Sequence, residues 1–283
     1  MTTKLQKGNI TSKLVTSNSR PTVLVFDSGV GGLSVYDEVR QRLPDLCYIY
    51  AFDNVGFPYG EKSEEYIIER VVHIVVGAIA RRYSISLCII ACNTASTVSL
   101  PALRTHFDFP VIGVVPAIKP AVRLTRNGVV GLLATRATVQ RSYIHHLVSQ
   151  FATSCQIVML GSAELVKLAE EKLHGQTISL HDVRRVIQPW LLMREPPDTA
   201  ILGCTHFPLL RQELQQVLPK GTYLIDSGTA IARRTAWLLE HEIPSVQSSH
   251  INCAFCTELN SKVLQLSPTL KHYGFPSLEK VVV

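Results

Sequence analysis

Two cysteines of this chain stand in the same kind of sequence context. Cys92 follows the apolar run LCIIA, and Cys204 follows the run AILG. An apolar run that leads directly into a helical pattern is typical of a buried strand ending where a helix begins. A helix N-terminus favours anions, and a thiol with an ordinary pKa of ~8.5 becomes a usable base there. Taken singly, each cysteine is better read as a small buried apolar residue. The repetition favours a pair of acid–base thiols.

Polar residues suited to binding an anion follow each cysteine. Asn93 and Thr94 follow the first, and Thr205 and His206 follow the second. His206 is either a general acid–base or an ordinary hydrogen-bonded loop histidine.

The glycine-rich segment FDSGVGGLS (residues 26–34) looks like a phosphate loop but fails both strict tests. It lacks the GK[ST] of a P-loop and the last glycine of GxGxxG, so nucleotide binding is a weak interpretation. We expect instead that Asp27, at a strand end, acts as an acid–base or amine-binding carboxylate. Ser28 and the glycines would then let backbone amides approach an anion. The alternative for Asp27 is a helix N-cap or turn residue.

Two further candidates lie elsewhere. The segment FPYGEKS (57–63) predicts a turn followed by a helix start, in which Tyr59 either donates to a carboxylate or packs a surface turn. Gly60 follows it in the same turn. Glu170 lies in the predicted helix AELVKLAEEKL, where a solvated charge is the ordinary role.

The remaining cysteines predict no metal site. The chain has seven cysteines, an odd number that favours free thiols. Cys253 and Cys256 form a lone CxxC, and a zinc site needs a second pair of ligands that His250 alone does not supply.

Composition bounds the class of protein. Hydrophobic residues make up 46% and charged residues 18% of the 283, enough for a sizeable core. The net charge of +6 suits an anionic substrate, but no Lys/Arg run of five or more residues occurs, which argues against nucleic acid as the main partner. No apolar run approaches the ~20 residues of a membrane span. Residues 1–20 are polar and lack the apolar core of a secretory signal, so we expect a flexible tail and a cytoplasmic protein.

Strand-like and helix-like patterns alternate along the chain, which predicts an α/β fold with parallel sheets covered by helices and with ligands at the carboxyl ends of the strands. We expect strands at 21–29, 47–54, 86–93, 110–115, 129–135, 155–162, 199–204 and 222–228. We expect helices at 33–43, 64–83, 94–107 (with Pro101 as its start or a kink), 138–151, 163–175, 179–193, 207–218 and 229–242.

The two halves of the pattern also echo one another faintly. Residues 23–29 (VLVFDSG) resemble 223–228 (YLIDSG), and Cys-Asn-Thr at 92–94 resembles Cys-Thr-His at 204–206. Two α/β lobes of related design that face one another would explain both echoes.

Together these motifs resemble the glutamate racemases of the aspartate/glutamate racemase superfamily. The matching stretches are FDSGVGGLSV, FPYGEKS, ACNTAS, GVVPAIKPA, GLLATRATV and LGCTHFPLL, in the family's order, over residues 22 to about 240. The resemblance implies two α/β lobes with pseudo-twofold symmetry and the active site between them. Residues 1–20 would be a flexible N-terminal extension, 21–116 with 227–283 a discontinuous first lobe, and 117–226 the second lobe.

The resemblance also implies roles for the candidate residues in a cofactor-independent, two-base interconversion of L-glutamate and D-glutamate. Cys92, assisted by Asp27, would act on D-glutamate. Cys204 would act on L-glutamate, assisted by His206 and Glu170. The substrate's α-carboxylate and amine would be held by Asn93, Thr94 and Thr205, and its side-chain carboxylate by Ser28, Tyr59 and Gly60.

The product would supply peptidoglycan synthesis. The long polar start resembles that of members from enteric-type Gram-negative bacteria, which implies the activator UDP-N-acetylmuramoyl-L-alanine. Two alternatives stay open. One is a related aspartate or hydantoin racemase, although FPYGEKS favours glutamate as the substrate. The other is a non-catalytic two-lobe module that binds an amino acid or nucleotide. The sequence does not decide between monomer and dimer.

Overall fold

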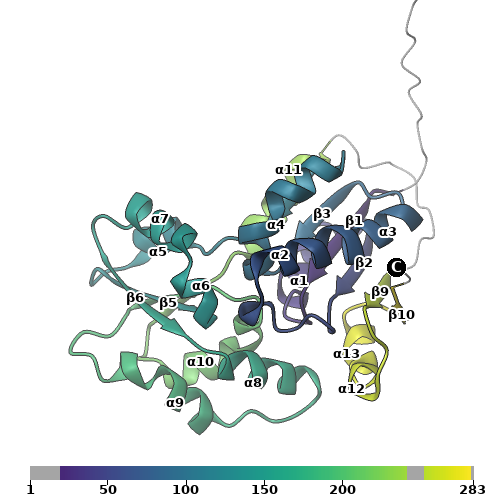
Figure 1. Ribbon diagram of the computed structural model, residues 1–283. Helices are drawn as coiled ribbons and strands as arrows, with labels where there is room; N and C mark the ends of the chain where they lie inside the picture. Colours follow the sequence, from purple (N-terminus) through teal and green to yellow (C-terminus); the bar gives the residue numbers. More distant parts are fainter. Residues whose placement is uncertain (1–19, 241–251, 282–283) are drawn as a thin grey trace, which may run out of the picture.

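Two parallel sheets organise the computed structural model, which describes residues 20–240 and 252–281 (Figure 1). The first sheet contains β1 (Thr22–Asp27), β2 (Cys47–Phe52), β3 (Leu87–Ile90), β4 (Val111–Gly113), β9 (Cys253–Cys256) and β10 (Ser277–Lys280). The second contains β5 (Val129–Ala134), β6 (Gln156–Gly161), β7 (Thr199–Leu202) and β8 (Tyr223–Ile225). All of their strand pairs are parallel. The α/β fold class predicted from the sequence is confirmed. The predicted extension, apart from Arg20, lies outside the described residues.

Helices cover both faces of each sheet. They are α1 (Leu33–Arg42), α2 (Glu64–Glu69), α3 (Gly77–Arg82), α4 (Asn93–His106), α5 (Ile118–Leu124), α6 (Arg136–Gln140), α7 (Ser142–Phe151), α8 (Glu164–Leu173), α9 (Leu180–Leu191), α10 (Arg211–Val217), α11 (Gly228–Leu239), α12 (Ser261–Leu264) and α13 (Ser267–His272). Among these described helices, each is too short or too polar to cross a bilayer.

The central strands are buried on both faces, which is why they appear in the sequence as continuous apolar runs. In β1, Val23 and Val25 pack into one apolar cluster, while Leu24 and Phe26 pack into a second cluster on the opposite face. The edge strands β6 and β8 are partly exposed.

The two sheets share a strand order. The first sheet runs β10-β9-β2-β1-β3-β4, and the second runs β6-β5-β7-β8. If β1–β4 and β5–β8 are each taken as one four-stranded unit, both units have the spatial order second, first, third, fourth. Cys92 follows β3 and Cys204 follows β7, which are the third strands of their units. The cysteine echo is therefore topological. The Asp-Ser-Gly echo is not, because its copies follow β1 and β8, a first and a fourth strand.

Several predicted helix boundaries are wrong. The helix expected at 64–83 is interrupted by a π-helical segment, η2 (Arg70–Val76), between α2 and α3. The helix expected at 138–151 is two helices, α6 and α7, which meet at an extended Arg141. Pro101 neither starts nor ends a helix, since α4 begins at Asn93 and continues past it. Periodicity shows a helical face but not these local changes of backbone winding.

The C-terminal segment returns to the first sheet. Strand β9 pairs with β2, and β10 pairs with β9. In Figure 1 this yellow segment, with α12 and α13, lies beside β2. The CxxC pair lies on β9, and residues three apart on a strand point to opposite faces, so Cys253 and Cys256 do not form a joint site.

Candidate active site

The carboxyl ends of both sheets open into one cavity of about 330 Å³. Segments after β1, β2 and β3 line it from the first sheet, and segments after β5, β6 and β7 line it from the second. Every site residue predicted from the sequence lines this cavity: Asp27, Ser28, Tyr59, Gly60, Cys92, Asn93, Thr94, Glu170, Cys204, Thr205 and His206. The structure thus brings together residues that lie as much as 179 positions apart, because parallel strands direct their carboxyl ends to one edge of each sheet and both edges border the same cavity.

Asp27 is fully buried at the end of β1. Its Oδ1 accepts from the amide of Ser28 at 2.6 Å, and its Oδ2 accepts from the amide of Gly32 and from Oγ1 of Thr205 at 3.2 Å. Burial raises the pKa of the Asp27 carboxyl, an effect that the nearby His206 and the two amide bonds only partly offset. Asp27 therefore contacts both lobes of the site, and burial makes its carboxylate easier to protonate than that of an ordinary aspartate.

Cys92 lies at the start of α4, where its Sγ accepts from the amide of Ala95 at 3.4 Å. Oγ of Ser28 lies 3.6 Å from the same sulfur. Burial and the charge of Asp27 raise the pKa of Cys92 to about 12. The thiol, rather than the thiolate, is therefore the resting form of Cys92.

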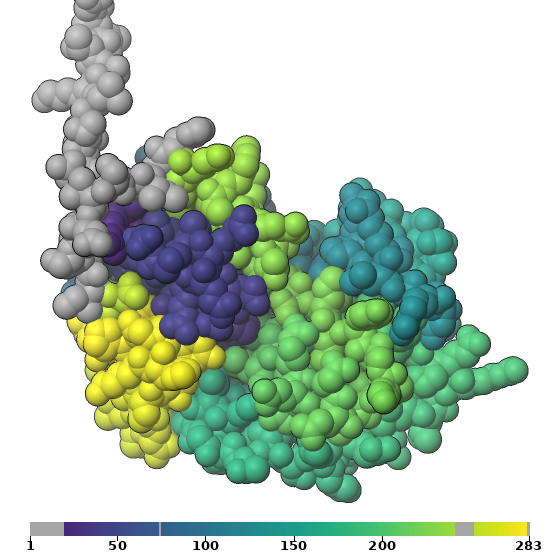
Figure 2. All heavy atoms as spheres, turned by 180° about the vertical axis from the view of Figure 1, so that it is seen from behind, coloured from purple at the N-terminus to yellow at the C-terminus, as the bar shows by residue number. Residues whose placement is uncertain are grey.

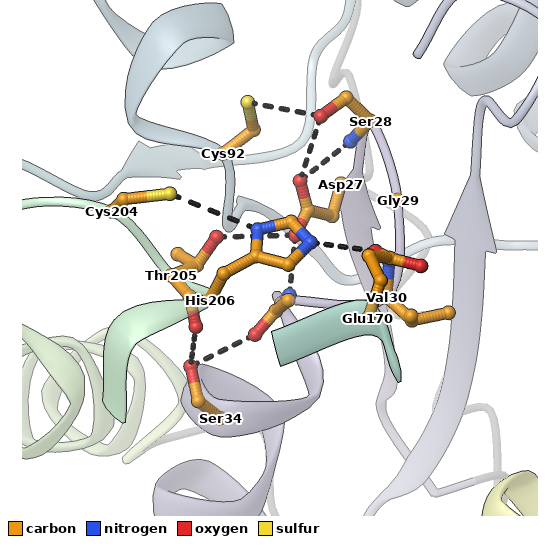
Figure 3. Close-up of polar contacts among 12 residues, drawn as sticks. Asp27, Ser28, Gly29, Val30, Ser34, Cys92, Glu170, Cys204, Thr205 and His206 are labelled. Carbon is orange, nitrogen blue, oxygen red and sulfur yellow. Dashed lines mark hydrogen bonds and ion pairs between the residues drawn. The ribbon is translucent and has the colours of Figure 1, made fainter. Parts of the chain in front are cut away.

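Cys204, His206 and Glu170 form a chain of contacts on the opposite side (Figure 3). Sγ of Cys204 lies 3.7 Å from Nδ1 of His206, and Nε2 of His206 lies 2.6 Å from Oε1 of Glu170. Burial lowers the pKa of His206, but its bonds to Cys204 and Glu170 outweigh burial and raise that pKa well above the ordinary value. Burial raises the pKa of Glu170, and the bonds from His206 and the Val30 amide outweigh it and lower that pKa. An imidazolium–carboxylate pair thus lies beside Cys204.

The glycines of the segment 26–34 make room for this chain of contacts. A Cβ on Gly31 would stand 2.3 Å from Nδ1 of His206, and a Cβ on Gly29 would stand 3.0 Å from Oε1 of Glu170. The sequence predicted that these glycines admit an anion. The structure shows them admitting side chains of the facing lobe.

The Ser34 hydroxyl adds a second hydrogen bond between the two lobes near Asp27. Oγ of Ser34, on α1, donates to the carbonyl of Thr205 at 2.7 Å. With the bond from Thr205 to Asp27, this contact ties the loop after β7 to the first lobe. The geometry of Cys204 relative to Cys92 therefore depends on contacts across the cavity.

Tyr59 lines the cavity, but its hydroxyl donates to Asp53 at 2.7 Å. The single phenolic proton is thus directed away from a bound molecule. The buried Oδ1 of Asn93, by contrast, has no hydrogen-bond partner. An unpaired buried acceptor costs free energy, so it marks a place where a ligand donor would bind.

Sequence reasoning missed part of the cavity wall. The additional lining residues are Phe57, Pro58, Glu61, Thr135, Arg136, Ala163, Val166, Lys167 and Lys262. Thr135 and Ala163 follow β5 and β6, so the rule that found Asp27 and the cysteines would have found them too. Lys262 comes from α12, and nothing in its local sequence indicates this position.

Comparison with known proteins gives consistent matches. Residues 24–235 match the family model described as Asp/Glu/Hydantoin racemase. The chain is 67% identical over 284 residues to a glutamate racemase of Escherichia coli O139:H28, covering 100% of this chain and 99% of that one. The crystal structure of Escherichia coli glutamate racemase in complex with L-glutamate and the activator UDP-MurNAc-ala matches with a TM-score of 0.90 and 68% identity, over 93% of this chain and 99% of that one. A glutamate racemase isoform from Bacillus anthracis matches with a TM-score of 0.78 and 28% identity, over 93% and 98%.

Proposed function

This chain belongs to the Asp/Glu/hydantoin racemase family, and we propose that it interconverts L-glutamate and D-glutamate by proton transfer at the α-carbon. The observation that carries the proposal is that two thiols, one from each sheet, line one cavity. A proton must leave one face of the α-carbon and another must arrive on the opposite face. A single fixed base tends to return the proton to the face it came from, whereas two bases do not.

On one side, Cys204 is proposed as the base that takes the α-proton from L-glutamate. The His206 imidazolium lies 3.7 Å from its sulfur and would stabilise the thiolate. Glu170 would hold the imidazole ring by the bond to Nε2 and keep it charged.

On the other side, Cys92 would deliver a proton as the thiol. Its raised pKa suits this role, because the group begins the step protonated. In the reverse direction Cys92 acts on D-glutamate as the base, and Asp27 and Ser28 would assist it, the latter by its contact of 3.6 Å with the sulfur.

Substrate would be held by groups that the protein leaves unpaired or places at the wall. Asn93, with its free Oδ1, is proposed to accept from the α-ammonium group, alongside Thr94 and Thr205. The side-chain carboxylate would lie at Ser28, Tyr59 and Gly60. Because the Tyr59 hydroxyl is bonded to Asp53, Tyr59 would contribute through its main chain.

The thiols and fixed donors are proposed to carry the chemistry without an added cofactor. Donors aimed at the developing carbanion would supply the stabilisation, and closing the cavity to water would strengthen it. The sheet memberships support a first lobe of residues 21–116 with 227–283 and a second of 117–226, between which closure would occur. All seven cysteines are free, which supports action in the reducing cytoplasm.

The product D-glutamate would serve peptidoglycan synthesis. Similarity to the Escherichia coli enzyme crystallised with UDP-MurNAc-ala supports the same nucleotide as an activator here. A second cavity of about 780 Å³, lined mainly by α4, β4 and α11, is the candidate place for it. Helix α11, light green in Figure 2, forms one of its walls. Arg104 and Arg234 line that cavity together with Phe107, Phe109 and Tyr143, a combination that suits a diphosphate attached to a ring.

Racemisation in heavy water tests the two-thiol reaction. Starting from L-glutamate, the D-glutamate formed early should carry deuterium at the α-carbon, while recovered L-glutamate should carry little. Substantial early label in recovered substrate would indicate a single base.

Cys92→Ala should abolish turnover in both directions. Tight binding of glutamate without exchange, and unaffected by thiol alkylation, would indicate a non-catalytic binding module. Turnover of aspartate or a hydantoin in preference to glutamate would indicate a different racemase.

A further inference from the structure

A buried carboxylate that sequence reasoning did not single out lies behind the cavity wall. Asp53 directly follows β2, and its side chain is fully buried. It accepts from Nε of Arg70 at 2.6 Å and also from Nη2 of that residue, in a two-pronged ion pair. It further accepts from Oη of Tyr59 at 2.7 Å, from Oγ1 of Thr257 at 2.8 Å and from the amide of Gly56 at 3.1 Å.

Burying these charges costs free energy of desolvation, so the pair is better explained by the geometry it imposes than by a gain in stability. Burying an ion pair removes both charges from water, and an apolar pair of similar volume is often as stable. Burial raises the pKa of Asp53, but the bonds from Arg70, Tyr59 and Thr257 outweigh burial and lower that pKa, so the carboxylate is charged. A charged carboxylate with every donor in place fixes the orientation of each group bonded to it.

The group fixed most directly is Tyr59. Its side chain is 1% exposed, and its one phenolic proton is committed to Asp53. The turn is wound tightly around the carboxylate, since a Cβ on Gly56 would stand 2.4 Å from Oδ2 of Asp53 and 2.8 Å from Cε1 of Tyr59. Tyr59 and Gly60 line the active-site cavity, whereas Asp53 and Arg70 do not.

Separate parts of the chain converge to hold this turn. Arg70 is the first residue of the π-helical segment η2, and π-helical turns in proteins are frequent at functional sites. Thr257 follows β9 in the C-terminal segment, where Oδ1 of Asn54 also accepts from the amides of Thr257 and Glu258 at 3.1 Å. The cavity wall at Tyr59 is thus anchored to a helix on one side and to the C-terminal segment on the other.

We propose that Asp53 and Arg70 are positioning residues that hold the Tyr59–Gly60 wall at the distance where it receives the distal carboxylate of the substrate. They set affinity and selectivity for a five-carbon dicarboxylic amino acid without touching it. The identity of the substrate rests on the proposed function. The pair acts on binding of the distal end and leaves both thiols in place, so its loss changes KM more than kcat.

The first test replaces the arginine. Arg70→Met should raise KM for L-glutamate about tenfold or more, as expected for loss of a charge-assisted anchor, and change kcat less than threefold. Arg70→Lys keeps the charge but loses the two-pronged geometry, so its KM should fall between those of the wild type and Arg70→Met. A KM within twofold of the wild type in Arg70→Met would overturn the proposal. So would a loss confined to kcat.

A double-mutant cycle separates positioning from direct contact. If the Tyr59 hydroxyl acts only through Asp53, Tyr59→Phe and Arg70→Lys disturb one unit, and the double variant should raise KM less than the product of the single effects. If the hydroxyl binds substrate itself, the two effects multiply, which would contradict the proposal.

Arg40→Met is the matched control. Arg40 also pairs with an aspartate, Asp37 at 2.7 Å, and lies over a tyrosine ring, Tyr36, but it does not line the cavity. It should leave KM within twofold of the wild type. Calorimetric binding of glutarate, a five-carbon dicarboxylate, keeps this inference separable from the proposed reaction. A wild type that binds glutarate but does not racemise glutamate refutes the reaction, while equal glutarate affinity in Arg70→Met and wild type refutes the positioning role.

Discussion

Gly31 and His206 lie so close that only a hydrogen fits between them: a Cβ on Gly31 would stand 2.3 Å from Nδ1 of His206 and 2.6 Å from its Cε1. The ring that neighbours Cys204 is therefore seated against the backbone of the opposite lobe. A rigid main-chain surface keeps the imidazole within reach of the sulfur.

Gly31→Ala should displace the imidazole from Cys204 and reduce kcat by about 10²-fold, the contribution typical of a positioned acid–base group. Turnover with L-glutamate and thermal unfolding are the measurements. Gly175→Ala is the control, because Gly175 has a φ of +84° with no neighbour within 4 Å of its Cβ. It should destabilise the fold by about 1 kcal/mol and leave kcat unchanged. Normal kcat in Gly31→Ala would show that the position of His206 is not limiting.

Thiol reactivity should distinguish the two cysteines of the free enzyme. They are almost equally exposed, 6% for Cys92 and 8% for Cys204, so ionisation rather than access decides the rate. Burial and Asp27 raise the pKa of Cys92 to about 12, whereas Cys204 lies beside an imidazolium. Iodoacetamide at neutral pH should modify Cys204 at least tenfold faster, as measured by peptide mass spectrometry. Faster modification of Cys92 would contradict the proposal that His206 activates Cys204.

The local sequence predicts most of the site because Asp27 and the residues at 92–94 and 204–206 stand at the ends of strands. Apolar runs predicted the ends of β1, β3 and β7. Parallel pairing brings Asp27 and Cys92 to one edge of the first sheet, and Cys204 lines the same cavity from the second sheet. The repetition of the cysteine motif predicted that Cys92 and Cys204 act as a pair, which neither motif alone could indicate.

Tertiary contacts explain what the sequence left open. In the sequence Glu170 looks like an ordinary charged residue on a helix. Its contact with His206 depends on the loop after β7, which is distant in the sequence. Asp53 and Arg70 look like a turn residue and a surface arginine, because their partners come from the 56–60 turn and from Thr257, far along the chain. The π-helical winding at Arg70 has no signature in the apolar periodicity of its helix.

Activation by UDP-MurNAc-alanine should depend on the second cavity. Arg234 lines that cavity, whereas its neighbour on α11, Arg233, does not. Arg234→Ala should raise the nucleotide concentration for half-activation about tenfold, the effect of losing one charged contact to a phosphate, and leave unactivated turnover within twofold. Arg233→Ala should change neither quantity. Equal effects of the two changes would place the nucleotide elsewhere.

The Glu170–His206 pair should give stability a defined pH window. The pKa of Glu170 is lowered, so its contribution is present above its ordinary value of ~4.3 and is lost as pH falls through the lowered value. The pKa of His206 is raised, so its contribution is complete below ~6.5 and is lost as pH rises through the raised value. Both contributions are present together between those two ordinary values.

Glu170→Gln should therefore lower the free energy of unfolding by about 1–3 kcal/mol near pH 5.5, and the difference from the wild type should shrink at strongly alkaline pH. Thermal unfolding across pH 4 to 10 measures it. Glu164→Gln, on the same helix and paired with Arg185 at the surface, should change stability by less than about 0.5 kcal/mol. A difference between Glu170→Gln and the wild type that is constant across this range would mean that the pair is not ionised, and the imidazolium would then be unable to stabilise a thiolate at Cys204.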